Sequence, residues 1–297
     1  MRNFLGAYPA LITPFRRNDQ MIDFDRLEVL VKLLLKADVD GFVVNGSTGE
    51  APYLTREERA KVIEFVKNCV GSKTIIAGVG GQSLRETTAY CKDAIKVGAD
   101  ALLVVTPYYF KPSQKALFEY YQGLKKEVDI PIILYNIPQL TGVEIPADIV
   151  ARLIDGERII GIKDSSGDIK YLTKVLYSIE EGYVFCGCDT ILYPALVSGA
   201  HGLILASLNV LPNDIIRIFN LCKNGKFSEA LRIYRELYPI LDIIFKYGVL
   251  AVKRAFEYLG IDMGVTREPL DIYRDIPNDI LDKLKTFLIS KQPLQMP

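Results

Sequence analysis

The sequence predicts an α/β fold, a (β/α)8 TIM barrel with a C-terminal helical extension. Three observations support this expectation. Eight short runs along the chain are continuously apolar, which is typical of parallel strands buried on both faces. Segments with a helical pattern separate these runs, as in consecutive βα units. After residue 210 the apolar runs stop and only helical patterns continue.

The predicted strands alternate with predicted helices. Two of the helices begin with a capping-box pattern, in which Thr55 is followed by Glu58 and Ser83 by Glu86. Eight βα units within about 220 residues are typical of a closed barrel. An open, doubly wound sheet is the alternative, because the number of strands does not by itself require closure. The predicted strands cover residues 7–13, 41–46, 74–80, 101–107, 131–137, 158–164, 183–188 and 202–207.

The last part of the chain is predicted to be entirely helical. No low-complexity linker separates it from the strands, so we expect a single domain over residues 1–297. Within it, the barrel is expected in residues 1–225 and the C-terminal helices in residues 226–297. The helical patterns of this part occupy residues 215–245, 248–260 and 278–291.

Composition and charge exclude several classes of function. The chain has 36 Lys and Arg against 36 Asp and Glu, which argues against nucleic acid or an acidic membrane as the main partner. No apolar run approaches the ~20 residues that a membrane-spanning helix needs. Pro9 and Pro14 interrupt the apolar N-terminus, which does not resemble a signal peptide. Five scattered cysteines and one histidine, His201, predict a cytoplasmic protein without a structural metal; a structural or hydrogen-bonding role is expected for His201.

The segment RIIGIKDSSGD, residues 158–168, ends an apolar strand on Lys163. In barrels of this class the chemistry lies at the C-terminal ends of the strands. Burial in an apolar strand end penalises a charged ammonium and so favours the free amine, which is the nucleophile in Schiff-base formation. The alternative is that the strand simply ends there and the lysine reaches solvent. A lysine at a strand end does not by itself decide between these two interpretations.

Other strand ends carry hydroxyl and phenol groups. The glycine-rich segment GSTGE, residues 46–50, offers two hydroxyls and several backbone N–H groups, which can bind a carboxylate. TPYY, residues 106–109, and Tyr135 add phenols at the same predicted rim. An ordinary βα turn and simple packing of the tyrosines are the alternatives.

Together these segments resemble the dihydrodipicolinate synthase / N-acetylneuraminate lyase family of class I, pyruvate-dependent aldolases. The resemblance implies a TIM barrel that commonly forms a homotetramer, a dimer of dimers, and an enzyme acting on small molecules, pyruvate plus an aldehyde. The chemistry implied needs no metal or other cofactor. Four segments in the expected order carry it: GSTGE, TPYY, YNIPQLTG (135–142) and GIKDSSGD (161–168).

The resemblance also implies a role for individual residues. Lys163 forms the imine with pyruvate, and Tyr135 is the general acid and base. Ser47 and the backbone of Thr48 hold the pyruvate carboxylate, and Ser47 links Tyr135 to Tyr109, which reaches across a subunit interface. The backbone of Ile204 lines the pyruvate site. The positions implied for binding the acceptor are Ser165, Gly187 and Asp189.

The segment YNIPQLTG departs from the synthase branch of the family at one position. Leu140 stands where that branch has an arginine that binds the carboxylate of aspartate semialdehyde. An apolar side chain cannot replace a guanidinium in that role. This segment is closer to the lyase branch, but Thr190 and Ala206 stand where that branch has a glutamate and a serine.

We therefore predict a pyruvate-dependent aldolase that cleaves or forms a 2-keto-3-deoxy sugar acid, such as 2-keto-3-deoxygluconate. Its hydroxylated pocket is expected to be formed by Ser165, Asp189, Thr190 and Ser207. Three alternatives stay open. The first is 4-hydroxy-tetrahydrodipicolinate (dihydrodipicolinate) synthase, with Lys111 as a possible substitute cation. The others are N-acetylneuraminate lyase and a non-catalytic keto-acid-binding protein.

Overall fold

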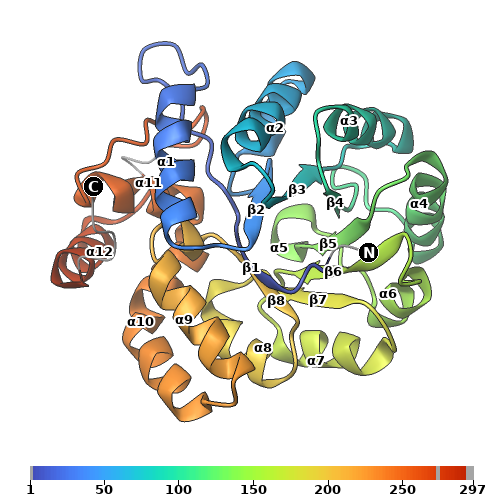
Figure 1. Ribbon diagram of the computed structural model, residues 1–297. Helices are drawn as coiled ribbons and strands as arrows, with labels where there is room; N and C mark the ends of the chain where they lie inside the picture. Colours follow the sequence, from blue (N-terminus) through green and yellow to red (C-terminus); the bar gives the residue numbers. More distant parts are fainter. Residues whose placement is uncertain (1–2, 272–274, 292–297) are drawn as a thin grey trace.

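The protein folds into a ring of eight strands surrounded by helices (Figure 1). The structure is a computed structural model that describes residues 3–271 and 275–291. All eight predicted strands are present, each slightly shorter than predicted. The strands are β1 Gly6–Pro9, β2 Gly41–Val44, β3 Thr74–Val79, β4 Ala101–Val105, β5 Ile132–Asn136, β6 Ile159–Asp164, β7 Tyr183–Cys186 and β8 Gly202–Leu205.

The sheet is parallel throughout and closes into a barrel. Its order runs β1-β8-β7-β6-β5-β4-β3-β2, and the two end strands meet again where Ala10 pairs with Val43. The Leu11 N–H donates to the Val43 carbonyl at 2.9 Å beside that bridge. The prediction of a (β/α)8 TIM barrel is therefore confirmed, and the open-sheet alternative is wrong.

The strands are continuously apolar because each is buried on both faces. In β3, Ile75 and Ala77 pack into the layer between sheet and helices, whereas Ile76 points into the barrel interior. This alternation follows from the two-residue period of a strand. The same period later decides which strand-end side chains face the barrel interior.

Helices cover the outside of the ring. Their starts follow the predicted caps: the Thr55 hydroxyl and the Glu58 carboxylate cap α2 reciprocally, and Ser83 caps α3 by accepting from Glu86 N–H. The Glu86 carboxylate accepts instead from the Gln82 N–H at 2.7 Å. The helices between the strands are α1 Phe24–Lys36, α2 Arg56–Val70, α3 Leu84–Lys96, α4 Gln114–Glu127, α5 Pro138–Thr141, α6 Ala147–Leu153, α7 Ile169–Ser178 and α8 Leu192–Val197.

After β8 the described chain is helical, as predicted. Helices α9 Pro212–Lys223 and α10 Phe227–Tyr247 pack together, and α10 ends at Gly248, whose positive φ of 55° turns the chain into α11 Val249–Tyr258. The last helix is α12 Asn278–Lys291. Residues 272–274 and 292–297 of the predicted C-terminal part lie outside the described residues, and the boundary at residue 225 stays a prediction.

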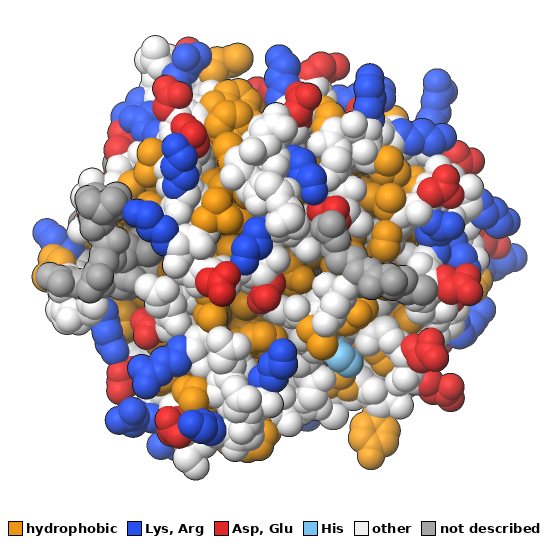
Figure 2. Space-filling view, in the orientation of Figure 1, with side chains coloured by type: hydrophobic (Ala, Val, Ile, Leu, Met, Phe, Trp, Pro, Cys, Tyr) orange, Lys and Arg blue, Asp and Glu red, His pale blue; other side chains and the backbone are white. Residues whose placement is uncertain are grey.

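The surface charges are mixed, as the balanced composition predicts, and the single histidine makes a backbone hydrogen bond. Figure 2 shows positive and negative side chains interspersed over one face of the molecule. The Nδ1 of His201 accepts from the Val184 N–H at 3.1 Å, which is the hydrogen-bonding role predicted for it. Among the described residues, none of the helices combines the length and hydrophobicity needed to cross a bilayer.

Candidate active site

A cavity of about 350 Å³ opens at the C-terminal ends of the strands. Its walls come from the loop after β2, from the ends of β5, β6, β7 and β8, and from the corner between α10 and α11. Segments that are far apart in the sequence therefore meet at one place. The cavity contains most of the predicted site residues: Ser47, Thr48, Tyr135, Leu140, Lys163, Ser165, Gly187, Asp189 and Ile204.

Lys163 lies in this cavity and is only 3% exposed, so the strand does not end by sending it to solvent. It is the register partner of Tyr135 on β5 and of Phe185 on β7. Its Nζ lies 4.3 Å from the centroid of the Tyr135 ring. An amine held against apolar and aromatic surface is in the dry environment that Schiff-base chemistry requires.

The next register pair along β5 and β6 fixes the position of Tyr135 and Lys163. Asn136 on β5 is the partner of Asp164 on β6, and its Nδ2 donates to Asp164 Oδ1 at 2.8 Å. The Asn136 Oδ1 accepts from the Ile145 N–H, and Asp164 also accepts from the Ser166 N–H. Burial raises the pKa of the Asp164 carboxyl, and these hydrogen bonds oppose the rise. The Asn136–Asp164 pair therefore fixes the ends of both strands, which carry Tyr135 and Lys163.

Ser47 joins the loop after β2 to the same pair. Its Oγ lies 3.4 Å from Tyr135 Oη, within reach of a long hydrogen bond. The loop is a tight turn, in which Gly49 N–H and Ala51 N–H both donate to the Gly46 carbonyl. Ser47 and Thr48 stand at its tip and line the cavity. The turn predicted from GSTGE is thus present and faces the amine.

Gly187 has to be a glycine because Lys163 passes over it. A Cβ added there would lie 2.5 Å from Lys163 Cε and 2.2 Å from Ser165 Oγ. The Ser165 hydroxyl donates to the Gly187 carbonyl at 3.0 Å, which holds the ends of β6 and β7 together. Asp189 accepts from the Ser207 N–H at 2.9 Å; burial raises its pKa, while Ser207 and the charge of Lys163 act in the opposite direction.

Three predicted positions lie elsewhere. Tyr109 is 77% exposed and packs edge-to-face on Phe110, away from Tyr135, so this chain alone does not bring it to the cavity. Thr190 and Ser207 do not line the cavity either, which corrects the predicted hydroxylated pocket. The Thr190 hydroxyl lies 3.2 Å from Cys188 Sγ, and Ser207 is fully buried. Both residues are in short 3-10 turns, Asp189–Ile191 and Ser207–Asn209.

Two residues that line the cavity were not predicted from the sequence. Lys246, near the end of α10, lines the cavity, although nothing in its helical pattern distinguishes it. Gln139 also lines it, and its Nε2 donates to the Ser165 carbonyl at 2.7 Å. Lys111 lies close by, because a Cβ added at Gly142 would be 3.4 Å from its Nζ. Lys246 thus shares the cavity with Leu140, and Lys111 lies beside Gly142, two residues further along the chain.

The described residues contain no cluster of three or more His, Cys, Asp or Glu side chains suited to hold a metal ion. The chemistry available in the cavity is that of an amine, a phenol, hydroxyls and backbone N–H groups. A buried amine with a phenol beside it can form an imine with a keto acid and move protons on that imine.

Comparison with known proteins gives one consistent result. The chain matches the Dihydrodipicolinate synthetase family over residues 3–288. It is 34% identical to the 4-hydroxy-tetrahydrodipicolinate synthase of Oceanobacillus iheyensis over 271 residues, 90% of this chain and 92% of that one. The dihydrodipicolinate synthase of Aquifex aeolicus superposes with a TM-score of 0.91 and 34% identity, covering 99% of this chain and 100% of that chain. CdNal from Clostridium difficile, solved with mannosamine, superposes with 0.88 and 30% identity, covering 97% and 99%.

Proposed function

Because the chain belongs to the Dihydrodipicolinate synthetase family and is a Schiff-base-forming enzyme of that family, we propose that it condenses pyruvate with an aldehyde that bears a carboxylate, as a 4-hydroxy-tetrahydrodipicolinate synthase. The observation that supports the chemistry is the single cavity in which Lys163, Tyr135 and the Ser47 turn meet. The relatives named as synthases, similar over at least nine-tenths of both chains, support this substrate better than the sugar acid that we predicted.

The covalent step belongs to Lys163. Its free amine attacks the keto carbon of pyruvate, and loss of water gives the imine. Loss of a methyl proton from the imine gives an enamine, whose carbon forms a bond to the carbonyl carbon of the aldehyde. Tyr135 moves the protons at the oxygens that react, since its phenol is close to the amine and to Ser47. The imine thus converts a ketone into an electron sink and then into a nucleophile.

The carboxylate of pyruvate binds at the turn after β2. The Ser47 hydroxyl and the backbone N–H of Thr48 are the donors, at a position where a turn presents successive N–H groups to an anion. This binding places the keto carbon beside Lys163 and leaves the methyl group facing the wider part of the cavity.

The acceptor carboxylate is bound by lysine in place of arginine. Leu140 offers no charge, and an unpaired carboxylate in a partly desolvated cavity costs ~1–3 kcal/mol. Lys246 lines the cavity and Lys111 lies beside Gly142, so these two lysines are the candidates for the cation that Leu140 does not supply. A lysine binds as a point charge and needs no bidentate geometry.

A second candidate is cleavage of a 2-keto-3-deoxy sugar acid, and Leu140 is the observation that favours it. The displacement of Thr190 and Ser207 from the cavity weakens this candidate, because it leaves Ser165 and Asp189 as the predicted polyol contacts there. An assay of pyruvate with a panel of aldehydes separates the two. Faster turnover of aspartate semialdehyde supports the synthase, whereas faster turnover of glyceraldehyde supports the sugar-acid lyase.

The assembly and compartment are also proposals. We propose a homotetramer in which Tyr109 completes the site of a neighbouring subunit, since its exposed ring pairs with Phe110 at the surface of the chain. Light scattering over a dilution series, with activity measured in parallel, tests this, and a fully active monomer contradicts it. All five cysteines are free thiols, which supports a reducing, cytoplasmic location.

A further inference from the structure

A fully buried ion pair lies directly behind the turn that carries Ser47 and Thr48. Glu50 closes this turn: its N–H donates to the Ser47 carbonyl at 3.0 Å, and its backbone has a left-handed φ of 57°. Its Oε1 accepts from Lys253 Nζ at 2.7 Å, and neither side chain has any exposed surface. The partner is 203 residues away in the sequence, on helix α11.

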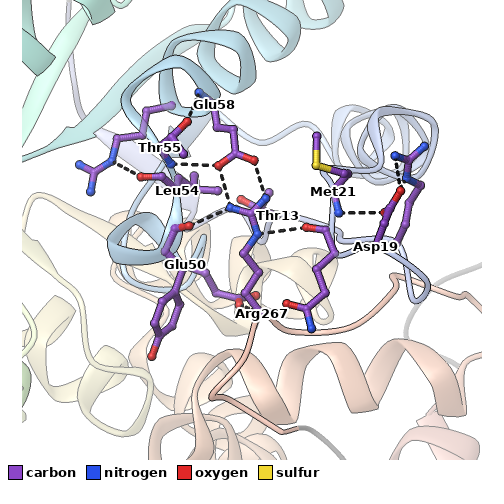
Figure 3. A network of polar contacts seen from close by, with 12 residues as sticks. Thr13, Asp19, Met21, Glu50, Leu54, Thr55, Glu58 and Arg267 are labelled. Carbon is purple, nitrogen blue, oxygen red and sulfur yellow. Dashed lines mark hydrogen bonds and ion pairs between the residues drawn. The ribbon is translucent and has the colours of Figure 1, made fainter.

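The other contacts of the Glu50–Lys253 pair connect it to three segments of the chain. Lys253 Nζ also donates to the Val265 carbonyl at 2.5 Å and stands 4.6 Å from the centroid of the Phe15 ring. The second carboxylate oxygen of Glu50 accepts from the Arg267 N–H at 2.9 Å. Figure 3 shows the Arg267 side chain continuing from there to Glu58 in the first turn of α2. The loop after β1, the turn after β2 and the segment after α11 therefore meet at one ion pair.

Stability alone does not account for charges at this place. Taking both partners out of water costs several kcal/mol per ion, and apolar replacements of buried ion pairs are often neutral or stabilising. Burial lowers the pKa of Lys253 to about 8 and raises the pKa of Glu50, with desolvation the largest cause for both groups. In some proteins a buried ion pair is retained because it fixes one arrangement of the segments that it joins, and this role is the one considered for Glu50 and Lys253.

Both segments contribute to the wall of the cavity. Ser47 and Thr48 line it, and so do Gly248, Val249 and Leu250, at the start of α11. Lys253 follows Leu250 by less than one turn of the same helix. The position of the turn relative to the start of α11 is thus tied to the Glu50–Lys253 contact.

We propose that the Glu50–Lys253 pair is a positioning device for pyruvate: it holds the turn at residues 46–50 against α11 so that the Ser47 hydroxyl and the Thr48 N–H face the substrate carboxylate. The inference rests on the proposed function, because it takes this turn to be the carboxylate site. Both residues act through Ser47 and Thr48 and do not touch the substrate.

The test uses borohydride trapping of pyruvate on the whole enzyme, which needs no aldehyde. Lys253→Met keeps an unbranched, apolar side chain of nearly the same length and leaves Glu50 buried without its cation. We expect the pyruvate concentration for half-maximal trapping to rise at least ~10-fold, while the rate at saturating pyruvate changes less than ~3-fold, since binding and not chemistry is impaired. A merely structural role predicts a lower melting temperature with both trapping parameters unchanged, and that result would overturn the proposal.

Three further measurements keep the result interpretable. Lys67→Met removes the cation of a lysine–carboxylate pair far from the cavity, with Asp100 at 3.1 Å, and should leave the half-saturating concentration unchanged. If Lys253→Met does not fold, Glu50→Gln replaces it. An amide has only one oxygen to accept from the two donors that the Glu50 carboxylate binds, so the same rise in the half-saturating pyruvate concentration is expected.

A wild-type enzyme that traps no pyruvate rejects the proposed function and not the role of the ion pair. Hydrogen exchange of the peptide covering residues 46–50 then tests the pair by itself: faster exchange in the variant supports it, and unchanged exchange rejects it.

Discussion

Lys163 and Tyr135 are register partners on adjacent strands, and the Lys163 Nζ lies 4.3 Å from the centroid of the Tyr135 ring. Parallel pairing at the C-terminal ends of β5 and β6 places the two side chains on the same, inner face of the barrel. The aromatic ring covers one side of the amine. The nucleophile and the phenol proposed to serve it are therefore positioned by the sheet itself.

Lys163 is expected to carry the covalent adduct. Incubation with pyruvate and borohydride should add mass to the peptide that contains Lys163, because reduction fixes the imine. Lys163→Arg should lower the rate at least ~10³-fold, since a guanidinium cannot act as the nucleophile. Lys174→Arg, on the exposed side of α7, is the matched control and should keep full activity. An adduct at another lysine would reject the assignment.

Tyr135→Phe is expected to separate imine formation from turnover. The substitution keeps the ring over Lys163 and removes only the hydroxyl that lies 3.4 Å from Ser47 Oγ. Turnover should fall by roughly 10²–10⁴, the usual contribution of a general acid or base, while slow borohydride trapping persists. Steady-state rates and trapping rates measured on the same preparation test this. Wild-type turnover in the variant would show that the phenol moves no proton that limits the rate.

Gly187→Ala is expected to displace the nucleophile. The added methyl group would lie 2.5 Å from Lys163 Cε, so the lysine has to leave its present position. We expect trapping to slow by at least ~10-fold with little loss of secondary structure, since a misplaced reacting atom is costly. Gly123→Ala in α4 is the control, because its methyl group would meet only the flexible end of Leu84. Equal trapping by Gly187→Ala and wild type would contradict the observed packing.

Much of the fold and the centre of the site could be predicted because both follow from local pattern. A strand buried on both faces is apolar throughout, and this pattern located all eight strands. The C-terminal ends of parallel strands share one rim, so strand-end residues such as Lys163, Tyr135 and Asp189 were expected together, and they line one cavity.

The remainder depends on contacts that no local pattern encodes. Glu50 belongs to a predicted turn, yet its partner Lys253 lies on a helix 203 residues later. The predicted polyol contacts failed for a different reason: Thr190 and Ser207 lie in 3-10 turns, where a strand's two-residue period no longer indicates which way a side chain points. Lys246 was missed because a lysine on an amphipathic helix is normally a solvated side chain.

The last prediction concerns Lys246 and the choice of aldehyde. If Lys246 binds the carboxylate of the acceptor, Lys246→Met should lower kcat/KM for aspartate semialdehyde at least ~10-fold, or ~1.4 kcal/mol, because the carboxylate then lacks its cation. The same variant should change kcat/KM for glyceraldehyde less than ~2-fold, since that aldehyde carries no charge. Leu140→Arg in the Lys246→Met background should restore activity with aspartate semialdehyde, because a guanidinium at that position enters the same cavity.

The control is Lys174→Met. Lys174 lies outside the cavity, so kcat/KM for both aldehydes should stay unchanged. Equal losses of kcat/KM for both aldehydes would mean that Lys246 maintains the shape of the cavity and does not bind the carboxylate. If the wild-type enzyme prefers glyceraldehyde, its function is that of a sugar-acid lyase. Leu140 is then the residue that determines the choice of an uncharged aldehyde.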